Sequence, residues 1–460
     1  MTHKQTPVLD AGDASARDGT TTQRSQPEAR HTTDVVMSRR VMLVGAAAAA
    51  GAALTSALPL NASRGSPVWP QAQPVDATPQ SMPTDPIVPL DATKVPGTPT
   101  TALGARSSFV TAARTPIGLN TGASYTPLQD LTGTITPADL HFERHHNGVA
   151  HIDPTRYTLM LHGLVDRPTI FTLDDLKRLP SVSRVCFLEC SGNGRTGYRA
   201  PKAELTPQLL EGLTGNSEWT GVRLSTLLSE VGAHRSATWL LAEGGDAAVL
   251  SRSVPMEKAI DDSLVVYAQN GEPLRPSNGF PVRLLLPGWE ANMCIKWLRR
   301  IELVDQPNMS RDETSKYTDP LPNDTARQFS FVMDAKSIIT APVFPQRLLK
   351  PGWQQITGLA WSGQGKIARV DVSTDGGATW TEGTLHEPVL SKAHTRFSLM
   401  WEWDGSAATL MSRATDERGG IQPTRAEFRA VRGAGTDFHF NHIHAWAIQP
   451  DGRVTYVVDK

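Results

Sequence analysis

The sequence predicts an α+β domain followed by an all-β sandwich. Residues 107–308 mix short strand-like runs with amphipathic helical segments, whereas residues 325–460 carry short alternating runs separated by turns. Residues 63–106 are rich in Pro, Thr, Ala and Ser, a composition typical of a flexible linker. A chain of 460 residues exceeds one ordinary core, so two domains are expected.

The elements of the first domain follow from its hydrophobic pattern. Strands are expected at residues 157–161, 185–188 and 282–286. In residues 173–179, Leu recurs at i, i+3 and i+6 behind Thr172, which predicts a helix capped by that threonine. Leu224–Val231 repeats the pattern and predicts a second helix.

The second domain shows the period of a half-buried sheet. Ile367–Ser373 alternates apolar and polar side chains, Asp375-Gly376-Gly377 predicts a hairpin turn, and residues 397–403 alternate again. Several such runs predict a sandwich. Four tryptophans are expected in its core: Trp361, Trp380, Trp401 and Trp403.

Charge and cysteine usage exclude several classes of protein. The net charge is −1, so nothing favours nucleic acid or an anionic membrane as a partner. Any anion site must be built from a few local arginines. The three cysteines (Cys186, Cys190 and Cys294) are too few and odd in number for a disulfide framework.

The N-terminus predicts export. Arg39-Arg40 precedes an Ala- and Gly-rich apolar run, which is typical of a twin-arginine signal within residues 1–62. That pathway carries folded proteins, as a cofactor loaded in the cytoplasm requires. The mature chain is expected in the periplasm without a stable membrane span, and the start codon is open between Met1 and Met37.

A glycine-rich loop follows the strand expected at 185–188. Gly192, Gly194 and Gly197 fit a dinucleotide fingerprint. However, residues 198–202 do not begin an apolar-periodic helix, and Pro201 would break one. A thiol at Cys190, near Arg195, would suit a transition metal, although spacing alone leaves a free packed cysteine equally open.

The loop also resembles a known family. Residues 189–195, Glu-Cys-Ser-Gly-Asn-Gly-Arg, resemble the Cys-(Ala/Ser)-Gly-Asn-x-Arg motif of the sulfite oxidases, and motifs at 142–146, 245–246, 278–288 and 294–298 follow in family order. The resemblance implies a molybdenum–molybdopterin cofactor with Cys190 as the metal ligand. It implies these cofactor contacts: Phe142, Arg144, His145, His146, Cys190, Asp246, Asn278, Arg283, Cys294, Ile295 and Lys296.

The same resemblance implies a substrate site and an immunoglobulin-like dimerisation domain over residues 325–460. Arg144, Arg195 and Arg432 would hold an anionic sulfur group, for which planar guanidinium donors are suited, and Tyr317 would hydrogen-bond beside the metal. There are departures. Asn278 and His145 replace the family's His and Asn, and the family's pocket tryptophan has no clear counterpart, since Trp219 is assigned to packing.

Within this family, one subgroup resembles the sequence more closely than the sulfite oxidases do. Residues 142–146, 287–293, 316–319 and 372–377 resemble the molybdenum subunits of sulfane dehydrogenases, which belong to bacterial thiosulfate-oxidising systems. The chain has no Cys-x-x-Cys-His, so it binds no c-type haem of its own. The resemblance implies a cytochrome c partner, a possible sulfur-carrier protein, and a homodimer or heterotetramer. The substrate stays open between sulfite and carrier-bound sulfane sulfur.

Other readings remain. A methionine sulfoxide reductase-type molybdenum enzyme would end near the first domain, so the long second domain argues against it. An exported scaffold with a decayed site is disfavoured because Cys190, Arg144, Arg283 and Lys296 are all present. His439, His442 and His444 lack the cysteine pair or His-Glu-x-x-His framework of a zinc site.

Overall fold

The structure is a computed structural model that describes residues 99–321 and 325–458. The predicted export signal and most of the predicted linker lie outside these residues. From Thr100 onward the chain forms one compact unit. No helix within the described ranges is long and apolar enough to cross a membrane.

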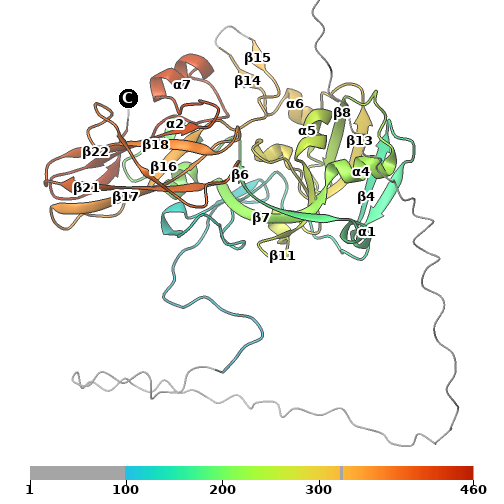
Figure 1. Cartoon of the computed structure of the whole chain (residues 1–460), viewed down its shortest axis with the longest axis horizontal. Helices are drawn as coiled ribbons and strands as arrows, with labels where there is room; N and C mark the ends of the chain where they lie inside the picture. Colours follow the sequence, from blue (N-terminus) through green and yellow to red (C-terminus); the bar gives the residue numbers. More distant parts are fainter. Residues whose placement is uncertain (1–98, 322–324, 459–460) are drawn as a thin grey trace, which may run out of the picture. The chain divides into compact units, whose positions relative to one another are not determined.

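The first half of this unit, from β1 to α6 (Thr115–Thr314), contains three sheets (Figure 1). One is the three-stranded sheet β1 (Thr115–Gly118), β2 (Gly122–Tyr125) and β3 (Glu143–His145). A second has the order β5 (Thr169–Thr172), β4 (Thr158–Gly163), β13 (Leu298–Val304), β8 (Trp239–Gly244) and β9 (Ser251–Pro255). The third has the order β11 (Glu272–Pro273), β10 (Leu264–Gln269), β7 (Thr214–Arg223) and β6 (Ser181–Glu189), with β12 (Arg283–Leu285) also paired to β10.

Local sequence explains the short helices of this half. Helix α1 (Leu173–Arg178) begins at a capping box, because the Thr172 hydroxyl accepts from the Asp175 backbone N–H and the Asp175 carboxylate accepts from Thr172. Helix α4 (Leu224–Val231) buries its leucines and ends at Gly232, whose φ of +68° suits glycine. Both predicted helices are therefore confirmed. The remaining helices are α2 (Arg195–Arg199), α3 (Pro207–Glu211), α5 (Met256–Asp261) and α6 (Arg311–Thr314), with single 3₁₀ turns η2 (Leu128–Asp130), η3 (Pro276–Asn278) and η4 (Ala291–Met293).

The second half holds two facing sheets. One has the order β16 (Lys336–Ala341), β17 (Gly352–Trp361), β21 (Thr395–Trp403) and β20 (Thr384–His386). The other has the order β19 (Thr381–Glu382), β18 (Ile367–Ser373), β22 (Ala408–Asp416), β23 (Ala445–Ile448) and β24 (Val454–Tyr456). A small hairpin, β14 (Asp319–Pro320) with β15 (Ala326–Arg327), precedes them. All pairings in these sheets are antiparallel.

Two details of the second half differ from prediction. Helix α7 (Arg425–Arg432) was not expected in an all-β region, and it begins at a capping box between Thr424 and Glu427. The tryptophans also divide. Trp361 and Trp403 are buried in the core and Trp401 packs against it, whereas Trp380 lies outside the core with the Arg413 guanidinium 4.4 Å from its ring centre.

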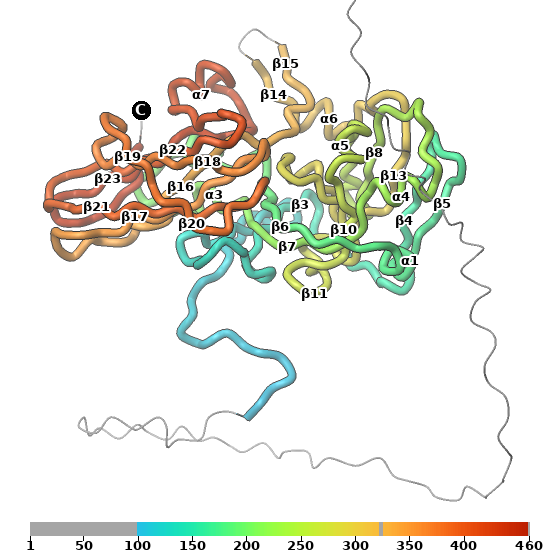
Figure 2. Tube along the Cα trace, in the orientation of Figure 1, coloured from blue at the N-terminus to red at the C-terminus, as the bar shows by residue number. Residues whose placement is uncertain are grey.

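The two halves share a hydrophobic core. Phe187 of β6, Leu128 of η2 and Leu210 of α3 belong to the same buried cluster as Trp361 and Trp446. The long pair of β6 and β7 is easily followed in Figure 2. Because β6 ends at Glu189, this shared core fixes the position of the residue that follows it, Cys190.

Candidate functional site

A tight turn presents Cys190 at the end of β6. The Cys190 backbone N–H donates to Leu213 O at 3.0 Å, and the Asn193 N–H donates back to Cys190 O at 2.9 Å. Gly194 has a φ of +88°, and a Cβ there would lie 2.7 Å from the Phe440 side chain. Glycine is therefore required on both conformational and steric grounds.

Helix α2 begins directly after this turn and ends at Arg199, before Pro201. It is a single turn, where the sequence had suggested no helix, and β7, which follows, is antiparallel to β6. The crossover to a parallel strand that a dinucleotide fold needs is therefore missing here.

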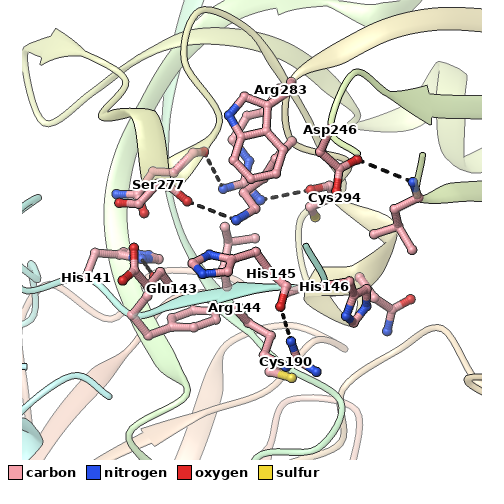
Figure 3. Close-up of a pocket in the computed structure, with 18 of the residues that line it drawn as sticks. His141, Glu143, Arg144, His145, His146, Cys190, Asp246, Ser277, Arg283 and Cys294 are labelled. Carbon is pink, nitrogen blue, oxygen red and sulfur yellow. Dashed lines mark hydrogen bonds between the residues drawn. The ribbon is translucent and has the colours of Figure 1, made fainter. Parts of the chain in front are cut away.

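Most of the predicted cofactor contacts line one cavity, named the first cavity here. The space between its lining residues is about 680 Å³, part of which is open to solvent. In Figure 3, Cys190 and Arg283 lie at opposite ends of the view with His145 between them. The predicted residues that line the cavity are Phe142, Arg144, His145, His146, Cys190, Asp246, Asn278, Arg283, Cys294, Lys296 and Tyr317. Ile295 was also predicted as a cofactor contact, but it does not line this cavity and instead packs within the core cluster.

Two cations in this cavity have only neutral partners. Arg283 is 4% exposed, and its guanidinium donates to Asn278 O and Cys294 O, both at 2.9 Å. Its Nε has no partner, and burial lowers its pKa to about 10. Lys296 donates to Ser277 O at 2.9 Å, and burial, followed by the charge of Arg283, lowers its pKa to about 7. Such groups suit an anionic ligand.

The cavity's histidines are neutral at pH 7. His141, which was missed in the sequence, has a pKa lowered to about 3 by burial, and its Nε2 has no partner. Burial also lowers the pKa of His145, and its Nδ1 has no partner either. These unpaired ring nitrogens can each donate to or accept from a ligand.

A second cavity meets the first at Cys190. It encloses about 950 Å³ and shares Cys190, Arg144 and Tyr317 with the first. Arg195 lines only the second of these two; its side chain is 43% exposed, and its Nη2 donates to Asp437 O at 2.6 Å. Burial raises the pKa of the Cys190 thiol, whereas the Gly192 N–H, Arg144 and Arg195 act to lower it.

Tyr317 is held between the two cavities by specific contacts. Its hydroxyl is 2.7 Å from His146 Nε2, and the Arg252 guanidinium lies 5.0 Å from its ring centre. Its φ is +45°, which is uncommon for a residue other than glycine. Burial raises its pKa, so the hydroxyl stays protonated at physiological pH.

Arg432 was predicted in the substrate site, and the structure corrects this. It lines neither cavity; its guanidinium lies 3.3 Å from both Asp319 and Asp334. The second half instead contributes Phe438, which lines the second cavity, and Asp437, which binds Arg195. The Arg-Gly pair at 432–433 ends helix α7, and the chain reaches the second cavity only after it, at Phe438.

A buried polar network beside Cys190 was not predicted from the sequence. Arg252 is fully buried and donates to Asn292 Oδ1 and to Glu290 Oε1. Asn292 donates to the Ser191 hydroxyl at 3.2 Å, and the His439 N–H donates to Ser191 O at 2.7 Å. The network braces the residue that follows Cys190. Glu290 and Asn292 lie in the 287–293 motif but had no assigned role, and Arg252 carries no motif signal, because single charged residues are normally on the surface.

The histidines near the C-terminus have other roles. His444 Nε2 lies 2.8 Å from Glu211 and its Nδ1 lies 2.9 Å from Tyr456. His439 Nε2 lies 3.5 Å from Glu290. Within the described residues, no group of three or more His, Cys, Asp or Glu side chains is arranged to hold a metal ion.

Comparisons with known proteins agree with this geometry. Residues 146–312 match the family model of the oxidoreductase molybdopterin binding domain, and residues 327–445 match that of the Mo-co oxidoreductase dimerisation domain. The crystal structure of the sulfane dehydrogenase SoxCD from Paracoccus pantotrophus is similar, with a TM-score of 0.76 and 42% identity, over 82% of this chain and 96% of that chain.

Curated relatives come from two groups of enzymes. Mitochondrial sulfite oxidase of Mus musculus is 30% identical over 68% of this chain and 62% of its own length. NADH nitrate reductase of Ulva prolifera is 29% identical over 70% of this chain and 42% of its own length. The chain therefore spans less than two thirds of these two relatives.

Proposed function

Because this chain belongs to the sulfite oxidase family of molybdenum enzymes, we propose that it oxidises a reduced inorganic sulfur group, either sulfite or sulfane sulfur from thiosulfate held on a carrier. The family matches agree with the predicted order of a molybdopterin-binding domain and an immunoglobulin-like sandwich. One observation carries the proposal: the Cys190 thiol lies where a cavity whose buried Arg283 and Lys296 donate only to backbone carbonyls meets a second cavity that reaches Arg195.

The residues of the first cavity fit a molybdenum–molybdopterin cofactor. Arg283 and Lys296 would bind its anionic part, since neither has a carboxylate in contact within residues 99–321 and 325–458. His141 and His145 offer unpaired ring nitrogens to polar edges of a pterin. Cys190 would ligate the metal as a thiolate, a soft ligand. When bound, the cofactor supplies two-electron redox and oxygen-transfer chemistry.

The protein's own part is to orient an anionic sulfur group. Arg144 and Arg195 flank Cys190 and present guanidinium donors suited to oxyanions. The Tyr317 hydroxyl, kept protonated and fixed by His146, would donate a hydrogen bond to that group. Arg432 is not included, since Asp319 and Asp334 already neutralise it.

Electrons would leave to a separate cytochrome c, because this sequence carries no Cys-x-x-Cys-His. We propose a complex with such a subunit on the motif resemblance, and work in the periplasm after twin-arginine export on the Arg39-Arg40 signal. The match of residues 327–445 to a dimerisation domain supports a homodimer or heterotetramer. Nitrate reduction is a second candidate, favoured by similarity to nitrate reductases.

The test is a metal analysis beside a steady-state assay. Protein exported from a pterin-competent host should contain about one molybdenum per chain and reduce cytochrome c with sulfite or thiosulfate as donor. Cys190→Ser should lose nearly all of this activity. Cys186→Ser, which alters a fully buried core thiol, is the matched control and should retain it. Nitrate-dependent turnover without sulfur oxidation would contradict the proposal, as would folded protein without molybdenum.

A further inference from the structure

The wall of the second cavity opposite the Cys190 turn is made by the β1–β2 hairpin. This hairpin precedes residues 146–312 and so lies outside the segment that matches the molybdopterin-binding family model. The hairpin contributes a polar side chain to this wall. Strand β2 ends with Tyr125, which lines the cavity together with Cys190, Arg144 and Arg195. The hairpin therefore places the Tyr125 side chain in the same cavity as Cys190, and none of the family motifs assigns a role to this hairpin.

Tyr125 is firmly held. It is 9% exposed, and its backbone carbonyl accepts from Gln208 Nε2 at 2.8 Å. The next residue, Thr126, donates its N–H to Gly212 O at 2.7 Å. Gly212 leaves room for the tyrosine, since a Cβ there would lie 2.9 Å from Tyr125 Cβ. A side chain fixed this way needs little ordering when it binds a ligand.

The hydroxyl of Tyr125 can donate to an anion. Burial and then the charge of Cys190 raise its pKa, while a hydrogen bond with the Thr196 side chain and the nearby Arg195 and Arg144 act to lower it. The group is therefore a protonated donor at physiological pH. Its partner Thr196 also lines the cavity and is itself a flexible hydroxyl. Tyr317, by contrast, has its hydroxyl engaged by His146.

We propose that Tyr125 is a substrate-binding residue, whose hydroxyl donates a hydrogen bond to an oxygen of the sulfur oxyanion group that Arg144 and Arg195 hold in the second cavity. Cys190 is then flanked by two tyrosines that both donate to the sulfur oxyanion group. Tyr317, which is fixed by His146, donates from where the two cavities meet, and Tyr125 donates from the β1–β2 hairpin. This inference rests on the proposed function, because it takes the second cavity as the substrate's.

Tyr125→Phe tests the proposal in the molybdenum-loaded full chain, because it removes one oxygen and leaves the ring. One lost hydrogen bond to a charged group predicts a KM for the preferred sulfur donor raised about ten-fold, with kcat changed less than about three-fold. Equilibrium binding of inorganic sulfate, a tetrahedral sulfur oxyanion, should weaken by a similar factor in titration calorimetry. Tyr157→Phe is the matched control, since it removes a buried hydroxyl that donates to Leu298 O in the core.

The outcomes are distinct. Unchanged KM and sulfate affinity in Tyr125→Phe, with an active wild type, would overturn the role of Tyr125 and leave the proposed function intact. A wild type that contains molybdenum but oxidises neither sulfite nor sulfane sulfur held on a carrier thiol would overturn the proposed function itself. Equal losses in Tyr125→Phe and Tyr157→Phe would also contradict the inference, because they would mark a general effect of removing a buried hydroxyl.

Discussion

Lys336 and Lys296 differ in what surrounds their ammonium groups. Lys336 is fully buried between Glu189 and Glu211, at 2.6 and 2.9 Å. Burial acts to lower its pKa, but the two carboxylates outweigh burial and raise it. Lys296 contacts a carbonyl and the ring of Trp297, and burial lowers its pKa to about 7. The Lys336 ammonium contacts two carboxylates directly, whereas the Lys296 ammonium feels Glu143 and Asp246 only at a distance, and these do not offset burial and the charge of Arg283.

This contrast separates a structural site from a binding site. Around Lys336, the Glu189 carboxylate also accepts from Trp361 Nε1 at 2.7 Å and from Asn193 at 3.0 Å, so residues of both halves meet behind the Cys190 turn. Such a closed network rigidifies and needs nothing more. Around Lys296 and Arg283, the donors are present and the anion is not part of the chain. A buried cation without a carboxylate therefore points to a ligand, and a neutralised one does not.

The largest expected effect is on stability when Lys336 is replaced. Lys336→Met leaves Glu189 and Glu211 buried without their counter-charge, so the free energy of unfolding should fall by about 3–5 kcal/mol. Chemical denaturation of the cofactor-free protein measures this. A loss below about 1 kcal/mol would mean that the cluster is no more than a surface-type ion pair.

A pH effect of intermediate size should come from Lys296. Its folded-state pKa of about 7 lies below the unfolded value of about 10.4. Between these values the unfolded chain binds more protons than the folded one, so the unfolding free energy of cofactor-free protein should rise with pH, by on the order of 1 kcal/mol per pH unit.

Lys296→Met isolates this contribution. The unfolding free energy of wild type minus that of this variant should rise from pH 7 to pH 10, because only the wild type gains stability there, and should be constant below pH 6. A difference that is flat across that range would show that the pKa of Lys296 is the same in the folded and unfolded cofactor-free protein.

The smallest effect on stability is expected at Arg283. Arg283→Met removes a buried charge that has no carboxylate in contact, so the unfolding free energy of cofactor-free protein should change by less than about 1 kcal/mol. The molybdenum content of protein from a pterin-competent host should nevertheless fall strongly. Arg275→Met, at an exposed pair with Glu272, is the control and should keep full molybdenum. Equal molybdenum in both variants would contradict a cofactor role for Arg283.

Local pattern predicted much of this architecture. The Thr172 cap, the leucine spacing of α4 and the alternation of β18 are all signals within one element, and all are present. Helix α7 had such a signal too, because Thr424 and Glu427 form a capping box three residues apart, but it was not used to predict a helix there.

The candidate site was predicted only where motifs name residues. Ten predicted cofactor contacts line the first cavity together with Tyr317, and all ten lie in family motifs. Arg252 and Tyr125 lie outside these motifs and were missed. The Lys336 cluster was invisible for another reason, since its partner Glu189 lies 147 residues away in the sequence. Arg432 was misplaced because an Arg-Gly pair says nothing of where a helix ends.

The hydrogen bonds from Arg195 to Asp437 have a consequence for when the site can form. They join residues 242 positions apart, so the Cys190 turn gains this support only after nearly the whole chain has been made. At about 5–20 residues per second, a ribosome needs on the order of 10 to 50 seconds for that stretch. A chain still in synthesis holds the turn through nearby partners such as Leu213 but lacks the contact between Arg195 and Asp437 throughout this interval. We therefore expect metal loading to follow completion of the polypeptide, and nascent chains that stall before Asp437 should emerge metal-free.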